Sequence, residues 1–415
     1  MALTSSDIDT TQPTNVGAIA APESPPTTGD LLIYLTPLAA PALEATLANL
    51  ASSFPANQTI GNILVAAPDT AQSITASQSL GSLTLLPYTP TTSALLLTAA
   101  DYVTAFQMAQ EHNARAYLLL GPESQNLDPA FVRSLAASLL DSGSADLVLP
   151  RYQLSPNSGL VNSAILYPVT RALYSLGPRF PQAIDIGLSL RMAERLAATA
   201  QRFTAAGQGD AILWPVAEAA SANWPLLEMD AGPRGLPQPT SSSLNVLLTE
   251  IAGSFFADIE ARASIWQRAR PLQPAGTATQ SLPSAEALPD VTPMIESFRV
   301  AYTNLQEIWA LVLPPQSLLG LKHLSLMPAA GFRMNDELWT RVVYDFILAF
   351  RLRTINRGHL LGALTPLYLA WAASHIRLVG DGVPPEQHIQ DLAATFERDK
   401  AYLVSRWRWP DRFNP

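Results

Sequence analysis

The sequence predicts an α/β fold, in which a mainly parallel sheet is flanked by helices and followed by a helical C-terminal region. Two observations support this prediction. Short apolar runs alternate with segments whose apolar residues recur at helical spacing, and strands separated by helices indicate crossover connections between parallel strands. After residue 293 helical patterns dominate. Ligands of such sheets bind at the carboxyl ends of the strands.

The predicted strands are short apolar runs that lack alternation, which is typical of strands buried on both faces. They cover residues 30–37, 62–69, 82–88, 114–121 and 145–152. Residues 212–235 are predicted to form a helix, a short strand and a loop.

Capping residues mark the starts of several predicted helices. Asp101 is the expected N-cap of the helix that follows it, Asp128 precedes a proline at the next helix start, and Asn335 begins a third helix. Further helices are predicted at residues 242–270, 359–379 and 384–407, the second of them kinked at Pro366.

These patterns divide the chain into four parts. Residues 1–29 contain no Lys or Arg and no apolar period, which predicts a disordered arm. Residues 30–270 form the predicted α/β domain. Residues 271–293 carry five prolines and are interpreted as a linker, and residues 294–415 form the predicted helical domain.

The composition excludes several classes of function. A formal charge of −9 argues against a nucleic-acid partner. All but two of the 25 basic residues are arginines, which suit carboxylate or phosphate recognition but also follow from a GC-rich genome. The absence of cysteine excludes disulfides and thiolate zinc sites, and fits a reducing cytoplasm. Neither a signal-peptide layout nor a membrane-spanning apolar run is present, so we expect a cytoplasmic, soluble protein.

The segment 146–189 concentrates polar groups that a sugar or phosphate pocket needs, namely Arg151, Asn162, Tyr167, Arg171, Tyr174, Arg179 and Asp185. If residues 162–174 form a helix, Tyr167, Arg171 and Tyr174 share one face and could present hydroxyl and guanidinium groups to a small acid. The alternative is that Arg171 ties this helix to a neighbouring loop.

Two stretches of this segment resemble a known family. NSAILYPVTRALY and RFPQAIDIGLS are similar to the acceptor-side region of bacterial glucosylglycerate and mannosylglycerate synthases, which are family 2-like GT-A glycosyltransferases. ELWTRVVYDF and RGHLLGALTPLYLAWAAS are similar to the C-terminal extension of these enzymes. The resemblance implies a GT-A fold and transfer of a hexose from a GDP- or UDP-sugar to a small hydroxy acid, such as glycerate or 3-phosphoglycerate, with magnesium.

The resemblance also implies roles for single residues. Asp185 would be the catalytic carboxylate, acting as a base or as electrostatic support, although a capping role is the alternative. Pro37 and Asp69 would contact the donor at two strand ends, although an acid there is often only a turn former. The implied acceptor-binding residues are Arg151, Asn162, Tyr167, Arg171, Arg179 and Ser189.

The metal motif departs from the family pattern. An Asp-x-Asp motif is expected after the strand at 114–121, but the sequence has Gly121-Pro122-Glu123-Ser124. Glu123 could hold a hydrated magnesium ion or be a solvated loop acid. The later loop, 228–239, lacks the expected histidine. Asp230 could replace it as a ligand, and Arg234 could neutralise the donor diphosphate directly.

Two hypotheses therefore remain open. The first is an active hexosyltransferase whose metal site is rebuilt from Glu123 and Asp230, with a nucleotide-sugar and a small acidic acceptor as ligands. It requires both carboxylates to converge on one ion, at about 2.0 to 2.6 Å per ligand oxygen. The second is a catalytically silent relative that binds or regulates an active synthase, or forms a homo-oligomer.

Overall fold

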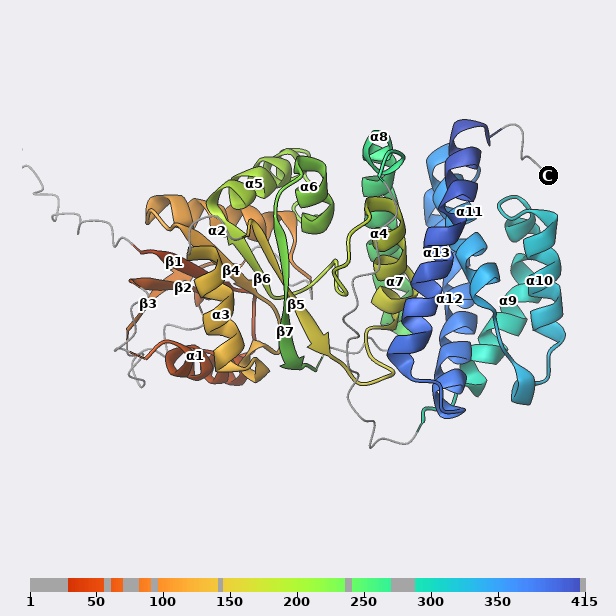
Figure 1. The fold of residues 1–415 in the computed structure, drawn as a ribbon, viewed down its shortest axis with the longest axis horizontal. Coiled ribbons are helices and arrows are strands. Elements are labelled where there is room, and N and C mark those ends of the chain that lie inside the picture. The colour runs from red at the N-terminus through yellow and green to blue at the C-terminus, as the bar shows by residue number, and fades with distance from the viewer. Residues whose placement is uncertain are drawn as a thin grey trace, which may run out of the picture.

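A computed structural model describes residues 29–55, 61–69, 82–90, 96–140, 145–235, 241–269 and 288–410. An α/β part and a helical part lie next to each other along the long axis of the molecule (Figure 1). The predicted arm up to residue 28 and the predicted linker up to residue 287 lie outside the described residues.

The described residues form one seven-stranded sheet with β6 antiparallel to both of its neighbours and all other pairs parallel. Six strands therefore end at the same edge. The predicted mainly parallel sheet is confirmed. Across the sheet the strands follow the order β3 (Leu83–Tyr88), β2 (Ile63–Pro68), β1 (Leu31–Leu35), β4 (Ala116–Leu120), β6 (Ile186–Ser189), β5 (Leu147–Gln153) and β7 (Leu226–Pro233).

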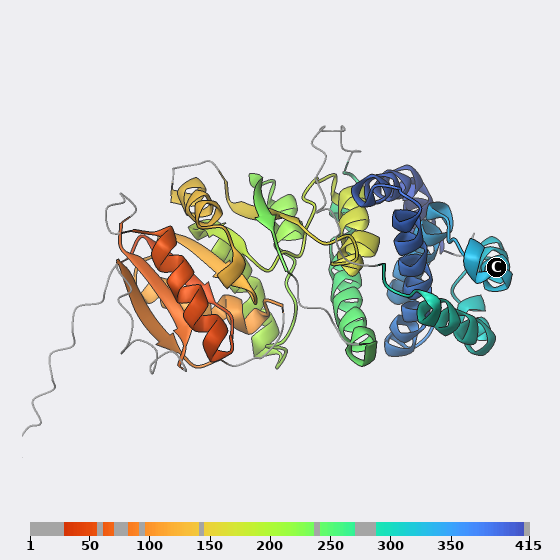
Figure 2. The ribbon, with the colours of Figure 1, turned by 90° about the horizontal axis from the view of Figure 1, so that it is seen from below.

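The central strands are apolar along their whole length because helices cover both faces of the sheet (Figure 2). One layer contains α1 (Ala40–Ser53) and α3 (Pro129–Leu140), which pack against each other. The other layer contains α2 (Ala99–Glu111), α5 (Leu190–Ala205) and α6 (Pro215–Ala222). Together they enclose the core of the α/β part.

Two of the three predicted caps are confirmed. Asp128 accepts a hydrogen bond from the N–H of Ala130 at 2.8 Å, and Asn335 accepts one from the N–H of Leu338 at 2.8 Å. The prediction for Asp101 is wrong, because Thr98 is the N-cap of α2. Asp101 is the third residue of the helix, and its carboxylate accepts a hydrogen bond from the N–H of Thr98 at 2.8 Å. The two residues form a capping box.

Strand β7 is longer than the short strand predicted there. It continues through Glu228 and Asp230 to Pro233, so both acids belong to an edge strand and not to a loop. Gly232 has a φ of +70°, and the pairing of β5 with β7 shifts between Arg151 and Tyr152. This irregularity marks a β-bulge, at which the strand bends locally.

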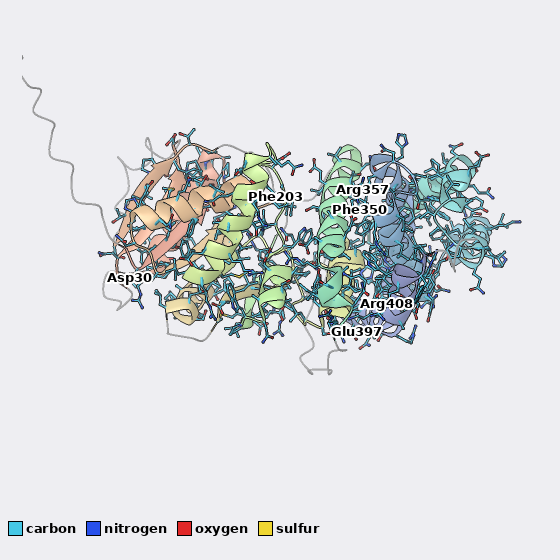
Figure 3. All side chains as sticks on the ribbon, turned by 90° about the horizontal axis from the view of Figure 1, so that it is seen from above. Asp30, Phe203, Phe350, Arg357, Glu397 and Arg408 are labelled. Atoms are coloured by element: carbon cyan, nitrogen blue, oxygen red, sulfur yellow. The ribbon has the colours of Figure 1, made fainter. Side chains whose placement is uncertain are left out.

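The helical part is a second large core, in which tryptophans at 266, 309, 339 and 371 are fully buried. Helix α12 continues through Pro366. The π-helical turn Asn162–Leu166 joins this core together with eight helices (Figures 1 and 3). These are α4 (Tyr167–Tyr174), α7 (Ser241–Ala261), α8 (Ala263–Trp266), α9 (Thr292–Ala310), α10 (Pro315–Leu326), α11 (Asp336–Leu352), α12 (Arg357–Gly380) and α13 (Pro385–Arg408).

Among the described helices, none combines the length and the apolar character that crossing a membrane requires.

Candidate functional site

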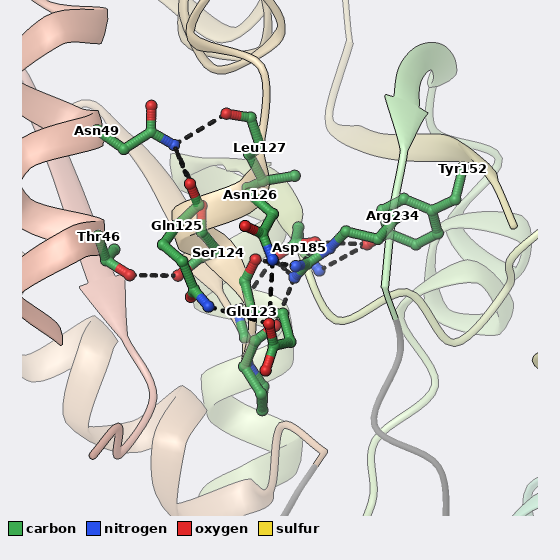
Figure 4. Close-up of polar contacts among 12 residues, drawn as sticks. Thr46, Asn49, Glu123, Ser124, Gln125, Asn126, Leu127, Tyr152, Asp185 and Arg234 are labelled. Atoms are coloured by element: carbon green, nitrogen blue, oxygen red, sulfur yellow. Dashed lines mark hydrogen bonds and ion pairs between the residues drawn. The ribbon is translucent and has the colours of Figure 1, made fainter. Parts of the chain in front are cut away.

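A buried ion pair lies at the carboxyl edge of the sheet, where a ligand of this fold would bind. Asp185 directly precedes β6, and Arg234 directly follows β7. The Arg234 Nη2 lies 3.0 Å from Asp185 Oδ2, and neither side chain has any exposed surface. Figure 4 shows the Arg234 guanidinium next to Asp185 and the loop of Glu123. The sequence did not indicate that these two residues form a pair.

All three nitrogens of the Arg234 guanidinium are engaged. Nε and Nη2 donate to Asp185, Nη2 also donates to the carbonyl of Pro122 at 2.5 Å, and Nη1 donates to the carbonyl of Glu123. Oxygens of a carboxylate and of two carbonyls thus surround the guanidinium. A hard divalent cation also prefers oxygen ligands of this kind. In this protein the positively charged guanidinium of Arg234 lies among them.

Asp185 has further partners of its own. It accepts hydrogen bonds from the hydroxyl of Tyr152 at 2.7 Å and from the N–H of Gly121 at 3.1 Å. Burial and the nearby Asp185 charge raise the pKa of Tyr152 well above its ordinary value, so the phenol stays protonated as a donor. The capping alternative for Asp185 does not hold, because Ser189 is the N-cap of α5.

The carboxylate of Glu123 binds within its own loop. Glu123 has a left-handed backbone, with a φ of +63°. Its carboxylate accepts hydrogen bonds from the amides of Gln125 and Asn126, at 2.9 and 3.0 Å. Helix α1 holds the same loop, because Asn49 donates to the carbonyl of Leu127 at 2.9 Å (Figure 4).

Asp230 lies on β7 with its side chain 76% exposed, and its carboxylate is 3.5 Å from Arg151 Nε. Arg151 pairs more closely with the half-buried Glu228, at 3.1 Å. Burial raises the pKa of Glu228, while contacts with Arg179 and Arg151 oppose the rise.

The described residues do not fit the magnesium ion that the resemblance implies. The carboxylates of Glu123 and Asp230 have separate partners, and the Arg234 guanidinium lies on the carbonyls of the Glu123 loop. Nowhere in the described ranges do three or more acidic or histidine side chains gather closely enough to hold a metal ion.

The two remaining donor-side residues are near strand ends. Pro37 follows β1 by two residues and is half-buried. Asp69 directly follows β2, is exposed, and accepts a hydrogen bond from the hydroxyl of Thr89. Both residues therefore belong to the same edge of the sheet as the Arg234 pair.

Arg171 and Tyr167 join α4 to α13. Arg171 makes a two-pronged contact with Glu397, at 3.0 and 3.2 Å, and donates to Gln390 at 2.6 Å. The hydroxyl of Tyr167 donates to the same Gln390 at 2.9 Å. Tyr174, predicted on the same face, instead donates to Asp258 of α7. These contacts favour the structural interpretation of Arg171.

Ser189 and Asn162 also make local contacts. The Ser189 hydroxyl accepts a hydrogen bond from the N–H of Met192 at 3.3 Å, which caps α5, and donates to Asp146 at 2.7 Å. The side-chain amide of Asn162 donates to the carbonyl of Arg179 at 3.0 Å. Asn162 thereby fixes the backbone on which the Arg179 side chain is placed.

Arg179 differs from the other predicted acceptor-side residues, because it lines a recess between the two parts of the molecule. Its Nε donates to both carboxylate oxygens of Glu386, at 3.1 and 3.2 Å, and its Nη2 donates to Ser163 at 2.9 Å. Its Nη1 is buried and has no acceptor among the described residues.

The recess is small, opens to solvent, and includes residues that the sequence did not indicate. Glu386 is 207 positions from Arg179, so no local pattern connects them. The recess is lined by Tyr152, Leu154, Ser155, Pro156, Ser158, Ser163, Arg179, Phe180, Pro385, Glu386 and Ile389.

Comparison with known proteins gave no matching family model and no matching curated protein. Solved structures similar to this chain include a mycobacterial protein, at 12% identity and a TM-score of 0.36, over 55% of this chain and 74% of that one. Glucosyl-3-phosphoglycerate synthase from Mycobacterium tuberculosis with phosphoglyceric acid is 12% identical, with a TM-score of 0.35 over 55% and 80% of the two chains. Its complex with Mn²⁺, UDP-glucose and phosphoglyceric acid gives 13% and 0.36, over 55% and 79%.

Proposed function

We propose that this protein is a catalytically silent glycosyltransferase-like protein that acts by binding, as a regulatory partner of an active synthase. The observation that supports this proposal best is the fully buried pair of Arg234 and Asp185. The pair lies at the carboxyl edge of the sheet, where a ligand of this fold would bind. The absence of cysteine agrees with a cytoplasmic location.

The chemistry of the pair argues against transfer. The Arg234 charge is balanced by Asp185, and all three of its nitrogens already donate to protein oxygens, so it offers little attraction to a diphosphate. Asp185 is shielded from solvent and accepts hydrogen bonds from Tyr152 and Gly121. A general base must reach the proton that it removes, and Asp185 has no open side from which an acceptor hydroxyl could approach.

A second candidate is hexose transfer from a nucleotide-diphospho-sugar to a small hydroxy acid. The shared carboxyl edge of six parallel strands favours it, since Pro37 and Asp69 lie near two strand ends there. This function would require Arg234 to leave Asp185. Breaking one side of a buried pair costs about 3 to 5 kcal/mol, which the donor would have to supply.

Calorimetric titration of the full chain separates the two candidates. UDP-glucose and a GDP-hexose would each be titrated with and without MgCl₂. The proposed function predicts only heats of dilution in all four titrations. Magnesium-dependent saturable binding would overturn it in favour of transfer, and metal-independent binding would do the same with Arg234 as the diphosphate ligand.

A further inference from the structure

We propose that the outer face of the α9–α10 hairpin binds a second copy of this chain in a twofold dimer. The hairpin comprises α9, α10 and the turn between them, residues 292–326. It lies at the end of the molecule that is far from the sheet (Figure 1). The inference goes beyond the proposed function and does not depend on it, because no residue of the hairpin belongs to the sheet edge.

Large aliphatic side chains are exposed on this hairpin. Val300 and Leu311 are 59% and 60% exposed, and Leu319 and Leu326 are 53% and 74% exposed. They are four of the ten large apolar side chains that are exposed in the described part of the chain, so more than a third of this set lies on one short hairpin. Exposed apolar side chains that gather in this way indicate an interaction surface, whereas scattered single ones do not.

Helix geometry directs these four side chains away from the core. Each of them is two positions from a buried side chain of the same hairpin, and two positions correspond to about 200° around a helix. The pairs of buried and exposed residues are Phe298 and Val300, Trp309 and Leu311, Leu321 and Leu319, and Leu324 and Leu326. Each helix therefore packs on the helical core with one face and leaves an aliphatic face open to solvent.

One carboxylate and one ammonium group lie between the exposed aliphatics. Glu307 is on α9, seven positions after Val300, and Lys322 is on α10, three positions after Leu319. Both are exposed, and this spacing places each on the open face of its helix. Neither side chain has a hydrogen-bond or ion-pair partner among the described residues. The open face thus carries two unpaired charges of opposite sign.

The opposite signs on the two helices select a second copy as the partner. In a twofold dimer the same surface serves both copies, so a contact between two residues occurs twice. If α9 of one copy lies against α10 of the other, Glu307 of each copy meets Lys322 of the other, and the aliphatic side chains become buried between them. The whole chain has a formal charge of −9, which makes two copies repel each other. The hairpin holds two acids and two bases, so this repulsion is weakest there.

Analytical ultracentrifugation of the full chain, from micromolar to submillimolar concentration, tests the inference. We expect a reversible equilibrium between monomer and dimer. Leu326→Glu should raise the dissociation constant roughly tenfold or more, because it brings two unpaired carboxylates into the contact. The matched control is Val246→Glu, since Val246 is 55% exposed on α7, outside the hairpin. It should leave the dissociation constant unchanged.

Three outcomes of this experiment would overturn the inference. The first is a monomer at every concentration. The second is a dimer that Leu326→Glu leaves intact, which would assign the contact to another surface. The third is an equal weakening by Val246→Glu, which would show that any added charge has the same effect.

A charge exchange tests whether the partner is a second copy. Glu307→Lys and Lys322→Glu each place like charges opposite one another, and each should raise the dissociation constant roughly fivefold. The double variant Glu307→Lys/Lys322→Glu restores opposite signs across the contact and should dimerise as the unmodified chain does. A double variant that dimerises no better than the single ones would contradict the pairing of α9 with α10 of the other copy.

Lys322 also allows a direct chemical test. The chain has two lysines, and the other one, Lys400, is buried. A carbodiimide couples an amine to a carboxylate that it contacts, so we expect a dimeric product in which Lys322 is joined to Glu307. Mass spectrometry identifies the linked peptides. Absence of this product, or the same yield of dimer with Lys322→Gln, would overturn the proposed contact.

Discussion

Two buried arginines of this molecule face carboxylates, yet their surroundings differ. Arg234 is fully enclosed, and all three of its nitrogens donate to protein oxygens. Arg179 contacts Glu386 and Ser163 but keeps Nη1 without an acceptor in the described ranges, beside a recess. The comparison teaches that two buried ion pairs of the same residue types can differ in how completely the protein satisfies the guanidinium.

The difference follows from the elements that supply each environment. Arg234 is held by strand ends and by the backbone of the Gly121–Glu123 loop, all within the α/β part. Arg179 lies where the α/β part meets α13, and the two surfaces do not close completely there. A junction between two cores leaves space that a single core would fill.

The largest expected effect concerns the Arg234 pair. Arg234→Met would leave the Asp185 carboxylate buried and without its cation, so we expect the free energy of unfolding to fall by about 3 to 5 kcal/mol. Urea denaturation followed by circular dichroism measures this loss. The double variant Asp185→Asn/Arg234→Met should be more stable than the sum of the single losses predicts. If the loss in the double variant equals the sum of the losses in the two single variants, the two side chains do not interact and the account is contradicted.

Arg171 provides the second test, because it contrasts a helix tie with a ligand contact. Arg171→Met removes its hydrogen bonds to Glu397 and Gln390, and we expect a loss of about 1.5 to 3 kcal/mol in the same denaturation assay. A variant as stable as the unmodified chain would contradict the interpretation of Arg171 as a tie between α4 and α13.

The histidines behind the recess give a pH-dependent test. His375 Nδ1 lies 2.7 Å from His388 Nδ1, and burial together with His388 lowers the pKa of His375 to about 3. As the pH falls, His375 therefore binds a proton in the unfolded state but stays neutral in the folded state. Between pH 7.5 and pH 5 this single group should cost about 2 kcal/mol of stability.

The test compares the pH dependence of stability of the unmodified chain with that of His375→Gln. The comparison is needed because Asp258 and Asp345 change the stability in the opposite direction. Burial raises their pKa values to about 6 and about 7, so these carboxyls stabilise the folded state as the pH falls. The stability gap between the unmodified chain and His375→Gln should shrink by about 2 kcal/mol from pH 7.5 to pH 5. A gap that stays constant would show that His375 is protonated alike in both states.

The smallest expected effect concerns Ser189. Ser189→Ala removes the side-chain cap of α5, and we expect the free energy of unfolding to fall by about 1 kcal/mol. Thermal unfolding measures this loss. An unchanged stability would contradict the capping role of Ser189.

Local patterns in the sequence predicted much of the fold. Apolar runs located β1, β2 and β4, and side chains such as Asp128 and Asn335 marked helix starts, because these features depend on near neighbours. Asp101 shows the limit of a local pattern, since its carboxylate reaches back to Thr98.

The site depends instead on long-range contacts. Asp185 meets Arg234 across 49 positions, and Arg179 meets Glu386 across 207. No spacing in the sequence encodes these pairs, because strand order and helix packing bring them together. The resemblance pointed to single residues such as Asp185, Arg179 and Arg234, while the partner of each arginine was evident only from the fold.

Titration with Mn²⁺ in the presence of UDP, followed by electron paramagnetic resonance, tests the central claim most directly. If the Arg234 guanidinium takes the place of the cation, the full chain should leave the signal the same as that of Mn²⁺ and UDP without protein. A saturable loss of the signal, at one Mn²⁺ per chain, would show that the chain holds a metal ion and would contradict the claim that Arg234 takes the place of the cation.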